Sequence, residues 1–241
     1  MVGRQNLDET LEMEQAMNHY AFYLANTLLH AYPDGSLWCP SKRILCVSDL
    51  HFGKSERIAR CGGNLLPPYE TRETLWRLEK AITAINPEKV ICLGDSFDDL
   101  DAVKSASDET RATLARLQTE RDWVWIEGNH DPGPVNLGGS NCKEIKRGEL
   151  TFRHIAQSST QDVEVGEISG HYHPKAAIRG ARHRPCFLLD KARLIMPAFG
   201  TYTGGMSSRH TILVDLMSAD TLAILTGKHA IPVPLAACTI R

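Results

Sequence analysis

Long apolar runs, paired cysteines and a strong net charge are all missing from this sequence of 241 residues. No run of about 18 apolar residues occurs, which excludes a membrane-spanning helix on sequence grounds. The seven cysteines are odd in number, scattered and without a CxxC spacing, so we expect free thiols in a reduced, cytoplasmic protein. The polar N-terminus has no apolar segment after a basic start, so no signal peptide is expected.

The composition leaves the kind of substrate open. A formal charge of -2 and a pI of about 6.5 supply no general basic field, so a nucleic acid would need a local basic patch. Hydrophobic residues at 42% and charged residues at 23% are ordinary for a soluble globular protein. Because no linker rich in proline, glycine or serine divides the chain, we predict an N-terminal extension over 1–19 and a single domain over 20–241.

The first half of the chain alternates apolar strands with amphipathic helices. Strands are predicted over 43–49, 89–95 and 122–128, and helices over 69–85 and 107–120. One or two further strands are expected between His19 and Trp38, around the turn YPDGS. Continuous apolar strands joined through helices predict a parallel sheet covered on both faces, with ligands gathered at the carboxyl ends of its strands.

The second half consists of short segments with strand-like sequences, several of them joined by hairpin-like connections. Strands are predicted over 149–154, 163–174, 184–199, 210–216 and 221–227. They predict a largely antiparallel sheet stacked on the first one. The expected fold class is therefore α/β (α+β), with two stacked β-sheets flanked by helices.

Side chains that can bind metal follow each of the three predicted parallel strands. Asp49 and His51 end the first, and on an extended strand their two-residue spacing would point both the same way. Asp95 ends the second, where a carboxylate can bridge two cations. Asn129 and His130 end the third. Each block alone is more typical of a solvated strand end or an ordinary turn.

Three histidines in the second half add to this series. His154 ends a predicted strand and, alone, would more often be a structural histidine. His171 and His173 repeat the two-residue alternation of Asp49 and His51. Oxygen and imidazole donors without a thiolate favour Mn, Fe or Zn over copper or an iron–sulfur cluster, and we expect Mn.

In order and in type, these blocks resemble the signature of the calcineurin-like metallophosphoesterases: D-x-H, G-D-x-x-D, G-N-H-[DE], a solitary His and G-H-x-H. The chain has them at 49–51, 94–98, 128–131, 154 and 170–173. The resemblance implies that superfamily's fold, with two mixed sheets, and two divalent metal ions. It assigns Asp95 to both ions as a bridge. The other ligands of one ion would be Asp49, His51 and His173, and those of the other ion Asn129, His154 and His171.

The resemblance also implies catalytic roles beside the metals. A hydroxide that bridges the two ions would be the nucleophile, and the ions would stabilise the attacking and the departing oxygen. With Asp95 as the bridging carboxylate, His130 would hydrogen-bond the phosphate and protonate or stabilise the leaving alkoxide. Asp98 or Asp131 would orient the imidazoles. Asp99 and Asp101 are interpreted as a solvated acidic loop.

A finer resemblance, to the bacterial DNA ligase-associated metallophosphoesterases (ligase-associated DNA damage response endonucleases), covers about residues 20–230. It rests on SDLHFGK (48–54) with the glycines and LPP (66–68) that follow, on ICLGDSF (91–97), on SGHYHP (169–174) and on the segment 184–205. It implies a metal-dependent phosphodiesterase or endonuclease acting on DNA in repair, in association with an ATP-dependent DNA ligase and a helicase.

The candidate substrate contacts are basic. Lys175 and Arg179 lie in the basic segment 173–185 and could guide a nucleic-acid backbone. Lys54 follows His51 closely, and the loop 200–205 is a further candidate. A solvated basic loop, an ordinary helix start and an ordinary hairpin turn are the respective alternatives.

Two other functions remain open. The same centre could serve a phosphomonoesterase, or a pyrophosphohydrolase of a small nucleotide or sugar-nucleotide. The chain could instead be a non-catalytic protein-binding scaffold, although such relatives typically lose ligands or the histidine of G-N-H, and all of these are present here. The native metal pair, the strand preference and the oligomeric state, a homodimer included, are left open by the sequence.

Overall fold

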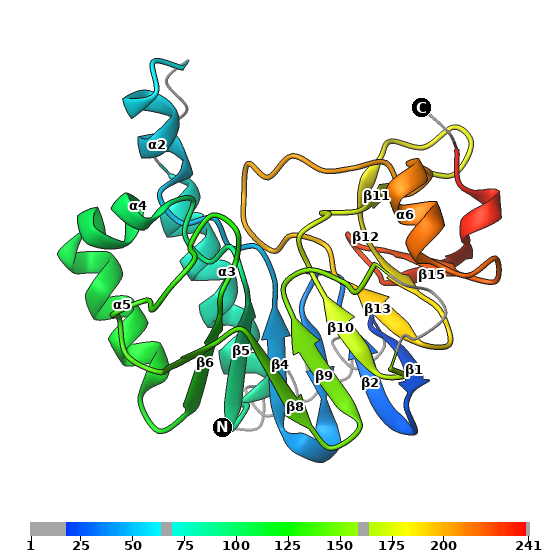
Figure 1. The fold of residues 1–241 in the computed structure, drawn as a ribbon, viewed down its shortest axis with the longest axis horizontal. Helices are drawn as coiled ribbons and strands as arrows, with labels where there is room; N and C mark the ends of the chain where they lie inside the picture. The colour runs from blue at the N-terminus through cyan, green and yellow to red at the C-terminus, as the bar shows by residue number, and fades with distance from the viewer. Residues whose placement is uncertain (1–17, 64–68, 159–163, 240–241) are drawn as a thin grey trace, which may run out of the picture.

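Two β-sheets stacked on each other make up the centre of the protein, with helices on the outside (Figure 1). The computed structural model describes residues 18–63, 69–158 and 164–239. The predicted extension falls outside these residues except for 18–19, and so does the LPP segment at 66–68. The predicted single domain over 20–241 stays a prediction, whereas the predicted fold class is confirmed.

The first sheet has seven strands in the order β1-β2-β3-β4-β5-β6-β7. Its strands β4 to β7 are parallel, as predicted for the first three of these, whereas β1 to β4 pair antiparallel. Three strands, rather than one or two, precede residue 40. The strands are β1 (Tyr20–Leu24), β2 (Thr27–Ala31), β3 (Leu37–Cys39), β4 (Ile44–Val47), β5 (Lys89–Leu93), β6 (Asp122–Ile126) and β7 (Ser140–Cys142).

Alternate residues of the parallel strands face two different cores. In β4, Ile44 and Cys46 belong to the core between the sheets, while Leu45 and Val47 pack with the helices on the outer face. The predicted helices are found there as α3 (Glu70–Ile85) and α5 (Asp108–Gln118). Burial on both faces explains why these strands are apolar throughout.

Two short helices complete this half of the chain, and the first begins at Lys54, where a helix start was the alternative to a substrate contact. They are α2 (Lys54–Arg60) and α4 (Leu100–Ser105). The predicted loop at Asp99 and Asp101 is wrong, because the Asp99 carboxylate accepts a hydrogen bond from Ala102 N–H at 2.7 Å and caps α4, which contains Asp101. Short 3-10 turns cover Pro40–Lys42 and Leu235–Ala237.

The second sheet has the order β15-β14-β12-β13-β10-β9-β8, with β11 paired to β12. It is largely antiparallel, as predicted, but β10 pairs parallel with both β9 and β13. Its strands are β8 (Glu144–Arg147), β9 (Leu150–Arg153), β10 (Glu167–Ser169), β11 (Lys175–Ala176), β12 (Arg184–Leu189), β13 (Arg193–Ile195), β14 (Leu222–Leu225) and β15 (Ile231–Pro234).

The strand predicted over 210–216 is wrong, because this segment is helix α6 (Thr211–Leu216). Its β-branched composition favours a strand. However, Leu213, Leu216 and Met217 are spaced by three and four residues, which places them on one helical face, and all three are buried in the core outside the second sheet. The helix lies beside β11 and β12 (Figure 1).

Hydrogen bonds join the two sheets next to the end of β4. Phe199 N–H donates to Ser48 O at 2.7 Å, and Gly200 N–H donates to Asp49 O at 3.1 Å. The approach is so close that a Cβ at position 200 would lie 2.1 Å from Leu50 O.

Among the helices that the structure describes, none combines the length and the apolar character that a membrane crossing needs.

We predict that Gly200→Ala destabilises the protein, because the new methyl group meets backbone that cannot move without breaking the contact between the sheets. The expected cost is about 1–3 kcal/mol of unfolding free energy, measured as a shift of the urea midpoint. Gly204→Ala is the matched control, since no atom lies within 4 Å of a Cβ there. Equal midpoints for the two variants would contradict this account of the contact.

Candidate metal centre

The loops after β4 and β5 continue the parallel pairing of these strands. Asp49 N–H donates to Gly94 O at 3.3 Å, and His51 N–H donates to Asp95 O at 2.9 Å. The Phe52 amide extends the series to Ser96 O at 2.9 Å. These hydrogen bonds hold Asp49 and His51 beside Asp95.

The candidate ligands converge through turns and not through strand alternation. The predicted extended conformation of Asp49 and His51 is wrong: β4 ends at Val47, and these two residues have φ values of 53° and 50°. Asp95, His171 and His173 also have positive φ, at 44°, 72° and 45°. Such a conformation costs on the order of 1–3 kcal/mol for a residue with a side chain, and clusters of it are typical of functional sites.

Among the described residues, the structure brings side chains into three groups that could hold a metal ion, of which one, His51 with Asp98 and His130, combines an imidazole with its hydrogen-bonded carboxylate, and the other two consist of predicted ligands. Asp49, His51 and His173 have donor atoms within 4.8 Å of one another, and so do Asp95, His154 and His171. Each of these two groups contains three of the four residues predicted for one metal ion. For the second ion the fourth residue is Asn129, whose Oδ1 lies 3.0 Å from His154 Nε2. The assignment of these residues as ligands remains a prediction.

Hydrogen bonds at Nδ1 orient three of the imidazoles. His51 Nδ1 lies 2.7 Å from Asp98 Oδ1, His154 Nδ1 3.1 Å from Leu93 O, and His130 Nδ1 3.0 Å from Asp98 O. An acceptor at Nδ1 places the proton there and leaves a lone pair on Nε2. The Nε2 atoms of His51 and His173 then face each other at 3.4 Å.

The charges and unpaired atoms of these groups fit divalent cations. Among the described residues, the buried Asp49 Oδ1 has no hydrogen-bond partner, although His173 Nε2 is only 3.0 Å away. Burial alone would lower the pKa of His154, yet Asp95 and Asp49 raise it to about 9. The two carboxylates thus attract positive charge onto an imidazole, which is the electrostatic condition for binding a cation.

Asp98 is buried and carries several contacts at once. Arg57 donates to its Oδ2 at 3.0 Å, and Lys54 Nζ lies 3.5 Å from its Oδ1. Burial opposes its ionisation, but the hydrogen bonds from His51 and Arg57 keep the pKa of Asp98 below its usual value. Lys54, a predicted substrate contact, is therefore partly committed to this carboxylate. Arg57 was not predicted to belong to the site. Its spacing of three residues from Lys54, which places both on the same helical face, could have indicated it.

Asp131, predicted as the alternative to Asp98 for orienting the imidazoles, accepts hydrogen bonds from three backbone amides. These are the N–H groups of Gly128 at 3.0 Å, Ser96 at 2.8 Å and Phe97 at 3.1 Å. Burial raises the pKa of Asp131 to about 6. Its carboxylate links the loop after β5 to the loop after β6.

Glycines allow the side chains of the centre to approach the backbone. A Cβ on Gly94 would lie 2.2 Å from His154 Nδ1, and one on Gly128 would lie 2.1 Å from Asp95 Oδ1. Both positions are glycines of the sequence motifs. The motif glycines are thus explained by the space that the candidate ligands occupy.

His130 lies at the open side of the centre. Its backbone N–H donates to Asp95 Oδ1 at 2.9 Å, and its Nε2 is 4.0 Å from Asp95 Oδ2. The side chain is 31% exposed. A substrate can therefore reach it from solvent.

The remaining predicted substrate contacts lie in the second half of the chain. Lys175 Nζ donates to Thr203 O at 3.2 Å, which connects it to the loop 200–205. Arg179 is exposed in the connection between β11 and β12.

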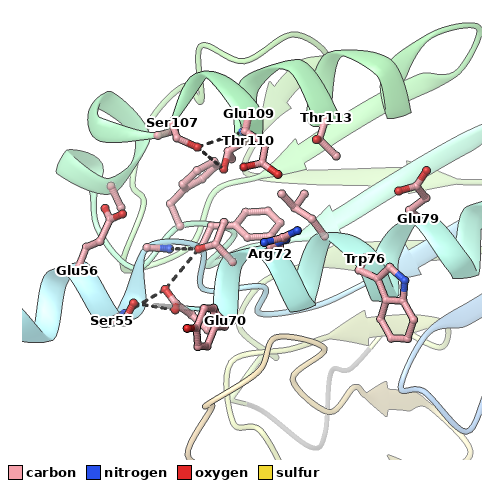
Figure 2. A pocket seen from close by; sticks show the side chains of 18 residues that line it. Ser55, Glu56, Glu70, Arg72, Trp76, Glu79, Ser107, Glu109, Thr110 and Thr113 are labelled. Carbon is pink, nitrogen blue, oxygen red and sulfur yellow. Dashed lines mark hydrogen bonds between the residues drawn. The ribbon is translucent and has the colours of Figure 1, made fainter. Parts of the chain in front are cut away.

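A separate cavity of about 410 Å³ lies among α2, α3, α4 and α5. Figure 2 shows Ser55 and the buried Glu70 at one side of it, and Ser107 and Thr110 at another. Its charged lining residues are Glu56, Glu70, Arg72, Glu79 and Glu109. None of the candidate ligands lines it, and its acidic character does not suit a phosphate-bearing substrate.

Comparisons with known proteins agree with this geometry. Residues 42–183 match the family model described as calcineurin-like phosphoesterase, and this span contains both donor groups. The crystal structure of Pseudomonas putida nuclease MPE is similar to the chain, with a TM-score of 0.70 and 26% sequence identity. That similarity covers 90% of this chain and 100% of the nuclease chain. No curated protein matches the sequence.

We predict that Asp98→Asn weakens metal binding by roughly 10- to 100-fold. The substitution removes the charged acceptor that orients the His51 ring through Nδ1. Competition with a chromophoric chelator measures the affinity. Asp101→Asn is the control, since Asp101 is exposed and pairs with Lys104. An unchanged affinity in Asp98→Asn would contradict the positioning role.

We also predict that divalent metal raises the melting temperature of the chelator-treated protein. A metal at about 100 times its Kd adds about 2.7 kcal/mol per site. His154→Ala should reduce the shift, whereas His229→Ala, at an exposed position outside both groups, should not. Equal shifts in both variants, measured by differential scanning fluorimetry, would argue against His154 as a ligand.

Proposed function

The chain belongs to the calcineurin-like phosphoesterase family and is a metal-dependent phosphoesterase, and we propose that it is a dinuclear phosphodiesterase that cleaves DNA. The observation that carries this proposal is the pair of adjacent donor groups at the meeting point of the two sheets. Similarity to a protein described as a nuclease supports the diester over other phosphate esters. A DNA repair role beside a ligase and a helicase extends the proposal, and it rests on the sequence motifs.

The proposed ligands divide between the two donor groups. Asp49, His51 and His173 would hold one ion, and Asn129, His154 and His171 the other. Asp95 would contribute to both, because its Oδ2 lies 3.4 Å from His154 Nε2 and its loop is paired with that of His51. Mn is the proposed metal, with Fe or Zn as alternatives, since all donors are oxygen or imidazole nitrogen.

The chemistry separates into what the ions supply and what the chain supplies. Bound divalent ions would lower the pKa of a water molecule and neutralise charge on the phosphoryl group. The chain contributes His130, which is held at two points, by its backbone amide on Asp95 and by Nδ1 on Asp98 O. Because Nδ1 already donates to Asp98 O, His130 would act in its imidazolium form, in which Nε2 also carries a proton, hydrogen-bonds the phosphate and gives that proton to the departing oxygen.

The basic side chains that follow His173 in the chain support a polyanionic substrate. Arg179 and Arg182 are exposed, and Lys175 and Arg184 are partly buried near the base of the same connection. A nucleic-acid backbone gains affinity from such contacts, in a salt-dependent way. The complete donor set argues against the non-catalytic scaffold, while a phosphomonoesterase or a pyrophosphohydrolase remains the competing function.

We predict that, with Mn²⁺ supplied, the protein hydrolyses bis-p-nitrophenyl phosphate with a higher kcat/KM than p-nitrophenyl phosphate. The physical reason is the open side of the centre, where the exposed Asn129 and the accessible His130 leave room for a second ester group. Parallel reactions on single-stranded, nicked and duplex DNA would identify the preferred form. A preference for the monoester would refute the phosphodiesterase proposal.

We predict further that His130→Ala lowers kcat for the diester by roughly 10²- to 10⁴-fold, because the proton donor is lost. The metal content, measured by plasma mass spectrometry, should stay at the wild-type level, since His130 is not a proposed ligand and the group that it forms with His51 and Asp98 is already hydrogen-bonded through both Nδ1 atoms. His229→Ala is the control histidine. Unchanged cleavage in a metal-loaded His130→Ala protein would show that the assigned role is incorrect.

A further inference from the structure

A pocket of about 370 Å³ opens directly beside the candidate metal centre. Its lining residues are His171, Tyr172, His173, Gly205, Met206 and Ile212, and we call it the Tyr172 pocket. His171 and His173 also belong to the two donor groups, one to each. The pocket therefore adjoins the place where a phosphate would be held.

The part of the Tyr172 pocket away from the histidines is apolar. It is formed by the ring of Tyr172, the thioether of Met206 and the side chain of Ile212, which is 46% exposed. None of its six lining residues carries a carboxylate. Such a surface suits a flat, uncharged group and leaves the phosphate to the metal side.

The pocket is preformed. Tyr172 and Met206 pack against the core cluster under α6, and the Tyr172 ring meets the His171 ring edge-on at 4.9 Å. Backbone hydrogen bonds hold the two segments together: Lys175 N–H donates to Met206 O at 2.8 Å, and Met206 N–H donates to His173 O at 3.2 Å. A ligand therefore does not need to order the walls before it binds.

The loop that carries Met206 is fitted tightly to the histidine segment. A Cβ on Gly205 would lie 2.6 Å from both His173 O and Lys175 Cε. The absence of a side chain at 205 thus brings Met206 next to His173, and places the Lys175 side chain behind the loop. Lys175 does not line the pocket, and its Nζ donates to Thr203 O. The feature that matches a nucleoside joined to a phosphate is thus the apolar wall next to the donor groups.

We propose that the Tyr172 pocket binds the nucleobase next to the scissile phosphate, with Met206 and Ile212 determining the affinity. The inference rests on the proposed phosphodiesterase function and specifies its substrate as a nucleoside-bearing diester. Bases of any sequence stack on aromatic and apolar side chains, so the pocket recognises a base without selecting among sequences.

The test compares dinucleotides with and without a base at each position. The substrates are thymidylyl-(3′→5′)-thymidine and two analogues, each with an abasic tetrahydrofuran residue on one side of the phosphate. Cleavage by the full chain with Mn²⁺ is followed by chromatography. Loss of the base on one side should raise KM by roughly tenfold, and loss on the other side should raise it less, which identifies the side that enters the pocket.

Variants in the pocket connect this preference to named residues. Ile212→Ala and Met206→Ala should each raise KM for the complete dinucleotide by roughly three- to tenfold, and by less for the analogue that lacks the bound base. Val214→Ala is the matched control, because Val214 lies on the same helix, is 41% exposed and does not line the pocket. Equal melting temperatures would establish that the variants are folded.

Each outcome decides the proposal. Equal KM values for all three substrates, or an Ile212→Ala effect that is the same with and without the base, would overturn it. Cleavage of bis-p-nitrophenyl phosphate without cleavage of any dinucleotide would overturn it as well. If the wild-type protein hydrolyses no diester at all, the proposed function itself fails, and this inference falls with it.

Discussion

The structure depends on holding two acidic side chains, Asp49 and Asp95, close together away from water. Both are buried, and the charge of Asp49 opposes the ionisation of Asp95. The surroundings outweigh burial and repulsion: the amides of His171 and His130 donate to these carboxylates, and neighbouring histidines stabilise their charge. The pKa of each therefore stays below its usual value. The positive φ values, the glycines and the oriented imidazoles all follow from this arrangement.

The centre is also a product of how the two sheets pack. Asp49, Asp95 and Asn129 follow strands of the first sheet, whereas His154, His171 and His173 follow strands of the second. Neither sheet carries a complete set of donors for either proposed ion. The separation of the donor groups is consequently set by the core between the sheets, in which residues such as Ile91 and Phe152 pack. Site geometry and core packing are therefore coupled, since close-packed cores resist small displacements.

The sequence was informative where a pattern repeats and less so where a single contact decides. The strands at 44–47, 89–93 and 122–126 were predictable because both of their faces are buried. The order of the motifs indicated the correct family. The backbone turns at Asp49 and His51 were not predictable, since strand alternation also explains a two-residue spacing. The contacts of Asp131 were not predictable, because the three amides that approach it come from two separate loops. Helix α6 was missed because its β-branched residues hide a helical spacing that becomes visible only with the second sheet beneath it.

The close approach of Gly94 to His154 links two positions that are 60 residues apart in the chain. The volume that a side chain at 94 would fill already contains the imidazole, so the two positions behave as one steric unit. A larger residue at 94 is compatible only with a smaller residue at 154, and that exchange removes the donor that the second group requires. Any compensated exchange at positions 94 and 154 therefore removes the His154 imidazole. Substitutions that keep the proposed metal site are restricted at both positions together.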